Sequence, residues 1–205
     1  MQLITFPLAP NGKRVEMFIA EKANARIETT NIGMDKASLE KIKHLNPLKQ
    51  VPILELEDGK ALCESTAICR YIESQFPDNN LLGNSAFEEA TIEMWQRRME
   101  LGFFIPIVEF GHHTHPFFKD SIKQIPEFGP FHKNKVLATI ELLNDVLAKQ
   151  HYIAGDRFTI ADITAYCGLQ LAAIFEMITL EDSPFKQWSK LIDQRQSAKY
   201  AQYAM

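Results

Sequence analysis

Several features that mark common protein classes are missing from this 205-residue sequence. No apolar run approaches the roughly 18 residues that a membrane span needs, and no cluster of Lys or Arg marks a nucleic-acid surface. The formal net charge is −4. The three cysteines form no Cys-x-x-Cys pair, and their odd number indicates neither a disulfide framework nor a zinc site. No Gly-x-Gly pattern indicates a dinucleotide or phosphate loop. We therefore expect a cytoplasmic globular protein that binds neither nucleic acid nor membrane.

The most informative stretch that is present covers residues 46–68. Pro52 opens a short apolar run, and because proline has no N–H it suits the first position of a strand. The Asp-Gly pair at 58–59 predicts a tight hairpin turn. The return strand leads into Glu64 and then into a helix for which Ser65 would be the N-cap. Such a helix start offers unpaired N–H groups to a carboxylate, although an ordinary capped helix has the same pattern.

The pattern Asn-Pro-x-x-x-Val-Pro, hairpin, Glu-Ser-x-Ala-Ile resembles the glutathione-binding half of the cytosolic glutathione S-transferase family. The resemblance implies a cis bond between Val51 and Pro52, and pairing of the Val51 backbone with the cysteinyl unit of glutathione. It also implies that Glu64 and Ser65 hold the γ-glutamyl end. The candidates for the glycine end are Lys36, Lys49 and Gln50.

The residue that would activate the glutathione thiol differs from the one found in most members of this family. The thiolate is the nucleophile, and a hydrogen bond to it lowers the thiol pKa. Family members place Tyr, Ser or Cys in or just after the first strand, where this chain has Phe6 and Ala9, which cannot donate. Ala-Pro-Asn-Gly at 9–12 resembles the Nu-class bacterial and fungal nitrogen-regulator-like proteins, in which the asparagine amide faces the sulfur. We therefore predict Asn11 as the catalytic group, and it would also serve as a helix N-cap.

The order of expected elements divides the chain. Residues 1–76 alternate as β-α-β-α-β-β-α, which resembles a thioredoxin-like α/β domain. Residues 77–84 break the pattern and are interpreted as a linker. Residues 85–205 contain no convincing strand, so we expect an all-α C-terminal domain, as in the transferase family.

Helix signals are clear in that second domain. A capping box from Ser85 to Glu88 predicts a long helix that is bent at Pro106. Val136, Ile140, Leu143 and Leu147 mark an amphipathic helix, and Ser183-Pro184 starts the last one. Thr159 and Asp162 form a second capping box in front of a largely apolar helix. On this view, Asp162→Ala would cost about 1 kcal/mol of stability.

The acceptor site, if the family pattern holds, is lined by residues of the bent helix. Its candidates are Phe104, Ile107 and His113, although Phe104 and Ile107 could equally be core residues. The histidines at 112, 113 and 115 suggest a metal site, but Glu109 has the wrong spacing for a zincin and no cysteine is close, so we predict no metal. A histidine that contacts substrate and a loop held by hydrogen-bonded histidines both remain open.

Two functions fit the sequence. The first is a glutathione transferase-like enzyme that conjugates small hydrophobic electrophiles or reduces disulfides or peroxides with glutathione. The second is a non-catalytic glutathione-binding or protein-interaction module with the same fold. The family pattern also implies a homodimer, to which Met94, Arg97 and Arg98 would contribute.

Overall fold

The computed structural model describes residues 1–203, and the chain forms two compact units. Within the described residues, the first unit contains Met1–Asn80 and residues 199–203, and the second is Leu81–Ala198. The stretch expected as a linker is therefore shared between the units. Residues 199–203, which the sequence analysis included in the helical domain, group with the first unit.

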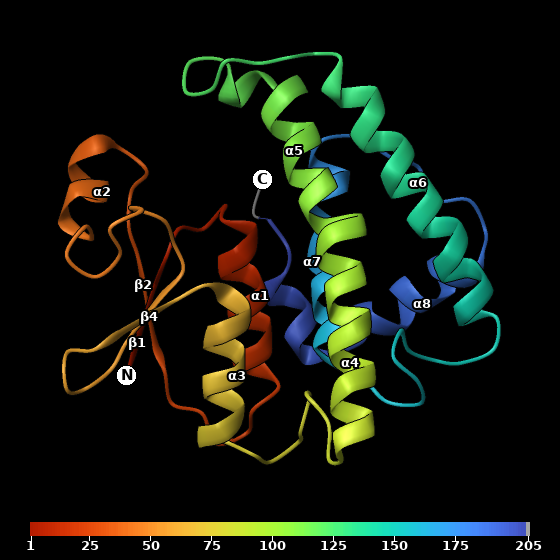
Figure 1. The fold of residues 1–205 in the computed structure, drawn as a ribbon, viewed down its shortest axis with the longest axis horizontal. Coiled ribbons are helices and arrows are strands. Elements are labelled where there is room, and N and C mark those ends of the chain that lie inside the picture. Colours follow the sequence, from red (N-terminus) through yellow and green to blue (C-terminus); the bar gives the residue numbers. More distant parts are fainter. Residues whose placement is uncertain (204–205) are drawn as a thin grey trace. The chain divides into compact units, whose positions relative to one another are not determined.

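The first unit has the predicted β-α-β-α-β-β-α order around one mixed sheet (Figure 1). Its elements are β1 (Gln2–Thr5), α1 (Pro10–Ala20), β2 (Glu28–Asn31), α2 (Lys36–Lys41), β3 (Ile53–Glu55), β4 (Ala61–Cys63) and α3 (Ser65–Gln75). The strands lie in the order β2-β1-β3-β4. The β1–β2 pair is parallel and the other two pairs are antiparallel, so the thioredoxin-like expectation is confirmed.

The two faces of this sheet are covered by different helices. Ile4 and Ile53 are paired in the register and are buried together with Ile42, which follows α2. Because side chains alternate along a strand, the paired residues Leu3 and Leu54 point to the opposite face, where α1 and α3 lie side by side (Figure 1). Both leucines are fully buried.

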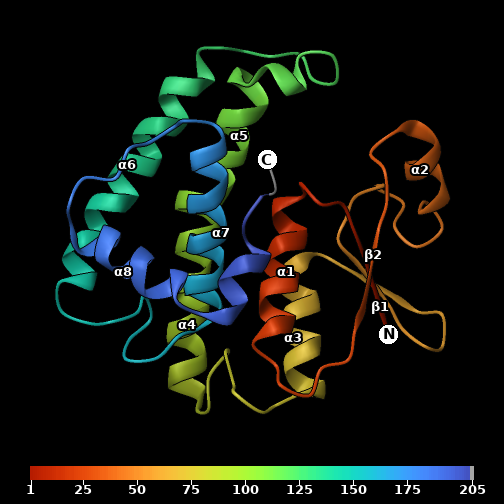
Figure 2. The ribbon, with the colours of Figure 1, turned by 180° about the vertical axis from the view of Figure 1, so that it is seen from behind.

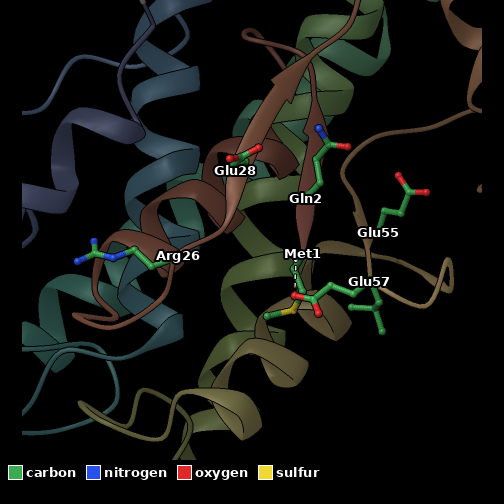
Figure 3. Close-up of a pocket in the computed structure, with 7 residues that line it drawn as sticks. Met1, Gln2, Arg26, Glu28, Glu55 and Glu57 are labelled. Atoms are coloured by element: carbon green, nitrogen blue, oxygen red, sulfur yellow. Dashed lines mark ion pairs between the residues drawn. The ribbon is translucent and has the colours of Figure 1, made fainter.

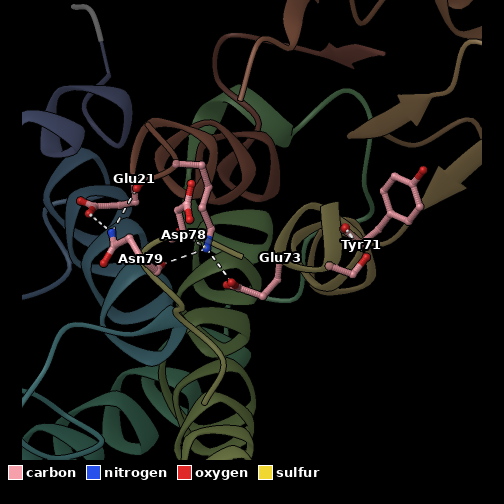
Figure 4. Close-up of polar contacts among 7 residues, drawn as sticks. Glu21, Tyr71, Glu73, Asp78 and Asn79 are labelled. Carbon is pink, nitrogen blue, oxygen red and sulfur yellow. Dashed lines mark hydrogen bonds and ion pairs between the residues drawn. The ribbon is translucent and has the colours of Figure 1, made fainter. Parts of the chain in front are cut away.

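A buried ammonium group joins the far ends of α1 and α3. Lys22 Nζ lies 2.6 Å from Glu73 Oε1, and it donates to the carbonyl oxygens of Asp78 and Asn79 at 3.2 and 2.9 Å. Figure 4 shows Glu73, Asp78 and Asn79 gathered at this point, with Glu21 bonded to the Asn79 amide. These bonds fix the two helices relative to each other and to the chain that follows α3.

The second unit is helical, as predicted, and its only β feature is an isolated bridge between Tyr152 and Gly155. Its α-helices are α4 (Ala86–Met99), α5 (Ile105–Thr114), α6 (Phe128–Leu147), α7 (Ile160–Ile174) and α8 (Pro184–Asp193). Helix α7 is apolar on all sides and packs against α4 and α5, as Figure 2 shows. It forms the centre of this unit's core.

The long helix is interrupted earlier than the sequence indicated. A π-helical segment, Glu100–Phe104, separates α4 from α5, whereas we expected a bend at Pro106. Pro106 is still the physical reason, because it has no N–H to give to the carbonyl of Gly102 four residues earlier. That carbonyl accepts a hydrogen bond of 2.9 Å from Thr139 Oγ1 instead.

The capping box at α7 is confirmed, but Asp162 does more than cap a helix. Its Oδ2 accepts from the N–H and the hydroxyl of Thr159 at 3.0 and 3.1 Å. Its Oδ1 accepts from the N–H of Ile153 and from Trp188 Nε1, both at 2.9 Å. Asp162 is fully buried, and this burial raises the pKa of its carboxyl group to about 6.

Candidate functional site

Six of the predicted site residues meet in one small pocket of the first unit. The pocket has a volume of about 40 Å³ and is lined by Asn11, Asn46, Gln50, Val51, Pro52, Glu64 and Ser65. These residues come from the start of α1, the loop before β3 and the start of α3. Three segments that are distant in the sequence therefore supply one site.

Asn46 organises the loop before β3. Its Nδ2 donates to the carbonyl oxygen of Gln50 at 2.9 Å, and its Oδ1 accepts from the N–H of Leu48 at 3.1 Å. Only 5% of Asn46 is exposed. Sequence reasoning used this residue as part of a motif and did not place it in the site, although its side chain holds the loop that presents Val51.

Val51 and Pro52 present a peptide edge to the pocket. The bond between them is cis, as the resemblance implied. Val51 precedes β3, and within residues 1–203 no loop or turn hydrogen bond uses its N–H or C=O. An extended ligand could therefore pair with this backbone as a further strand would.

The start of α3 differs from the prediction in one respect. Glu64, and not Ser65, is the N-cap residue, with φ 69° and ψ 113°. Positive φ is uncommon for a residue with a side chain, and such strained residues cluster at ligand sites. Ser65 is the first residue of the helix, and its hydroxyl makes side-chain bonds to α1 in place of a cap.

Asn11 is also not the N-cap that the sequence allowed. Helix α1 begins at Pro10, and Ala9 in the cap position makes no side-chain bond. Asn11 Oδ1 instead accepts a hydrogen bond of 3.1 Å from Ser65 Oγ. The residue thus lies in the second position of the helix, where its amide reaches across to α3.

Arg14 is the site residue that sequence reasoning missed. Its guanidinium is fully buried, and Nη1 donates to Ser65 Oγ at 2.9 Å. Its spacing of three residues from Asn11 places both on one face of α1, which is the signal that could have identified it. The first turns of α1 and α3 and this cation together make the pocket favourable for a carboxylate.

Cys63, next to Glu64, is not set up as a nucleophile. Burial and the nearby Glu64 carboxylate raise the pKa of its thiol. Its Sγ lies 3.8 Å from the carbonyl oxygen of Leu45. The protonated form is therefore favoured at neutral pH.

The lysine candidates lie outside the pocket. Lys36 is the exposed first residue of α2 and does not line it. Lys49, also outside the lining, forms an ion pair with Glu40, and this bond lowers the pKa of the Glu40 carboxyl group. Of the three candidates for the glycine end of glutathione, the structure brings only Gln50 to the pocket.

The acceptor-site candidates belong to the second unit. Phe104 and Ile107 are 2% and 0% exposed, so their side chains are packed as core residues in this structure. The Nδ1 atom of His113 accepts a hydrogen bond of 3.2 Å from the N–H of Ile125. His115 Nδ1 accepts from the N–H of Phe117 at 3.3 Å. These bonds hold the loop after α5, which is one of the two roles left open for the histidines.

No group of three metal-ligating side chains occurs in the part of the chain that the structure describes. A larger, open hollow of about 440 Å³ lies at the end of the sheet (Figure 3). Its labelled residues include Arg26, Glu28, Glu55 and Glu57, and Glu57 pairs with the N-terminal ammonium at 3.6 Å. It contains none of the predicted site residues, so the smaller pocket is the better candidate.

Comparisons with known proteins agree with this architecture. Residues 3–80 match the family model for the N-terminal domain of glutathione S-transferase, and residues 131–194 match the C-terminal domain model. Glutathione S-transferase 2 of Saccharomyces cerevisiae is 33% identical over 199 residues, which cover 94% of this chain and 85% of that protein. The crystal structure of Gtt2 from the same organism has a TM-score of 0.90 at 31% identity and covers 98% of this chain and 100% of that one.

A second kind of relative is a longer protein that matches this chain over only part of its own length. The probable elongation factor 1-gamma 2 of Arabidopsis thaliana is 31% identical over 166 residues. The match includes 78% of this chain but only 38% of that protein. The similarity is therefore to one part of a longer protein.

Proposed function

This chain belongs to the glutathione S-transferase family, and we propose that it binds glutathione as a co-substrate in the pocket formed by α1, the loop before β3 and α3. The observation that supports this most strongly is the convergence of Asn11, Val51 and Ser65 on one polar pocket. Amides, a hydroxyl, an unpaired backbone edge and a helix start suit a short peptide with charged ends.

The γ-glutamyl end is assigned to the start of α3. Its carboxylate would accept hydrogen bonds from the backbone N–H of Ser65 and from the other first N–H groups of the helix, which carry the positive end of the dipole. The Ser65 hydroxyl stays bonded to Arg14 and Asn11. Its ammonium group would pair with Glu64, whose backbone at φ 69° belongs to the same corner of the pocket. The buried Arg14 adds positive charge behind the carboxylate.

The rest of the peptide is assigned to the loop before β3. The cysteinyl unit would pair with the backbone of Val51, which Pro52 and the bonds of Asn46 hold in place. Gln50 would contact the glycine end. Lys36 could approach that end only from outside the pocket lining, so we give it a weaker, electrostatic role.

Asn11 is assigned to the glutathione sulfur. An amide N–H is a weaker donor than a hydroxyl, and it neither supplies nor removes a proton, so it lowers the thiol pKa only modestly. Conjugation to a hydrophobic electrophile would then be slow. Disulfide exchange is less affected, because nucleophilicity rises with thiol pKa and the optimum lies near ambient pH. We therefore propose that reduction of disulfides or peroxides by glutathione is the stronger activity.

Activity assays on three proteins test this chemistry. Wild type, Asn11→Ala and a triple variant with Cys63, Cys69 and Cys167 changed to Ser are compared for glutathione-dependent disulfide reduction and for conjugation of a chlorinated aromatic. Reduction should exceed conjugation, fall in Asn11→Ala and survive in the triple variant. Loss of reduction only in the triple variant would mean that a protein cysteine carries the chemistry.

The second candidate is a binding module without catalysis. Phe6 and Ala9 favour it, since neither replaces the usual hydroxyl or thiol, and so does the similarity to part of an elongation factor 1-gamma. As a glutathione-binding module the chain would still bind glutathione, whereas as a protein-interaction module it would not need to. Saturable binding with no turnover of either substrate class would favour this candidate over the enzyme.

A homodimer is proposed from family membership. Met94 on α4 is 41% exposed, while Arg97 pairs with Glu100 and Arg98 lies over the Trp95 ring. Sedimentation should give twice the chain mass at micromolar concentration. A monomer there would rule the dimer out.

A further inference from the structure

Three side chains form a directional chain of hydrogen bonds behind the pocket. Arg14 Nη1 donates to Ser65 Oγ at 2.9 Å, and Ser65 Oγ donates to Asn11 Oδ1 at 3.1 Å. Arg14 is fully buried and Ser65 is 5% exposed. Asn11 and Ser65 line the pocket, and Arg14 is absent from the lining. The proposed thiol-binding group is therefore linked to a buried cation through one hydroxyl.

The direction of this chain follows from what each group can do. A guanidinium has only donors and keeps its charge, so it must occupy a lone pair of Ser65 Oγ. The Ser65 proton is then free to go to another acceptor, and Asn11 Oδ1 is the acceptor within reach. Because the amide group of Asn11 is planar, its nitrogen points away from Ser65 when its oxygen faces Ser65.

We propose that Arg14 is a positioning residue, which acts through Ser65 to hold the Asn11 amide with its nitrogen toward the glutathione sulfur. With the opposite orientation, the amide oxygen would face the sulfur and repel the thiolate, because an oxygen acceptor cannot stabilise an anion. Arg14 thus sets whether Asn11 lowers or raises the thiol pKa. This inference rests on the proposed binding of glutathione.

The experiment measures the thiol pKa of bound glutathione from the ultraviolet absorbance of the thiolate, at saturating glutathione. The proteins are wild type, Arg14→Met, Asn11→Ala, the double variant and Arg14→Lys. Arg14→Met should raise the pKa by about one unit, which is a tenfold loss of thiolate below both values. Asn11→Ala should raise it similarly, and the double variant no further, because both changes remove one interaction. Arg14→Lys keeps a donor-only cation and should restore most of the wild-type value.

The double variant separates positioning from a direct effect of charge. If Arg14→Met raises the thiol pKa in the Asn11→Ala background by as much as it does in wild type, Arg14 acts through its own charge and the inference is wrong. An unchanged pKa in Arg14→Met would overturn it as well. If Arg14→Met does not fold, Ser65→Ala breaks the same chain without removing the cation. It should raise the pKa as much as Asn11→Ala does, and no rise would contradict the inference.

The failure of glutathione binding is a distinct result. Wild type that shows no saturable thiolate signal would contradict the proposed function before Arg14 is considered. Wild type that binds with a lowered thiol pKa, insensitive to Arg14, would leave the proposed function standing and refute this inference alone.

Discussion

Replacement of Asp162 by alanine tests the energetic account of the helical unit. From the sequence alone, this change is predicted to remove one helix cap. In the structure it removes the acceptor for the N–H groups of Ile153 and Thr159 and for Trp188 Nε1, all at 2.9 to 3.0 Å. Asp162 itself is completely buried, so these donors have no ready access to water.

The magnitude follows from the unpaired donors. Each buried donor left without a partner costs about 1–3 kcal/mol. The three costs are not additive, because the site relaxes and water enters the space left by the carboxyl group. We therefore expect Asp162→Ala to lower the free energy of unfolding of this unit by about 3–5 kcal/mol, well above the roughly 1 kcal/mol of an ordinary cap.

Urea unfolding followed by tryptophan fluorescence measures this change, because both tryptophans, Trp95 and Trp188, lie in the second unit. Ser183→Ala is the matched control. Ser183 caps α8 in the same unit by accepting from the N–H of Lys186 at 3.3 Å, and its loss should cost about 1 kcal/mol. Equal losses in the two variants would refute the assignment of Asp162 as a buried hub of four hydrogen bonds.

Three further predictions concern stability. Because burial raises the Asp162 pKa from 3.8 to about 6, the folded chain holds a proton that the unfolded chain releases. In wild type, the free energy of unfolding should therefore fall as the pH rises from about 4 to about 6. Urea unfolding at several pH values measures this change, and the slope should be shallower in Asp162→Asn. Gly12→Ala should lower the melting temperature, since a Cβ there would clash with Thr5 Oγ1; an unchanged value would contradict this packing. Lys22→Met removes the buried partner of Glu73 and should cost about 3–5 kcal/mol by chemical unfolding, and a loss below 1 kcal/mol would mean the pair contributes little.

Local sequence signals were sufficient for most of the fold. Pro52 and the Asp-Gly turn at 58–59 specify the hairpin of β3 and β4, and the capping box of Thr159 and Asp162 specifies the start of α7. Ser85 caps α4 as predicted, but the Glu88 carboxylate accepts from the N–H of Asn84 and not from that of Ser85. These signals act through a few neighbouring residues, so tertiary context changes them little. The mixed sheet and the helical unit followed from them and from the family resemblance.

Features that depend on packing between elements could not be predicted. The left-handed backbone of Glu64 is a strained state that its own sequence does not favour. The bonds of Ser65 to Asn11 and Arg14 require α1 and α3 to lie side by side at one register. The sequence therefore identified Asn11 and Ser65 as polar helix-start residues, but the cap that it assigned to Ser65 and the additional cap role that it allowed for Asn11 are both wrong.

The helical unit shows the same limit. The π-helical segment at Glu100–Phe104 begins six residues before Pro106, and the bond from Thr139 to Gly102 comes from another helix. Phe104 and Ile107 have the aromatic and branched side chains of either a pocket wall or a core. Only their burial distinguishes the two, and burial is a property of the folded unit.

Calorimetric titration of the chain with glutathione tests the central claim most directly. The assignment predicts saturable binding to wild type and a dissociation constant that rises about tenfold to a hundredfold in Ser65→Ala. The change removes the charge-assisted hydrogen bond from the buried Arg14, worth about 1.5–3 kcal/mol, that holds the start of α3 in place at the carboxylate site. Ser183→Ala, remote from the pocket residues in the sequence, should bind as wild type does. No saturable heat with wild type, or equal affinity in Ser65→Ala, would contradict the placement of glutathione at the start of α3.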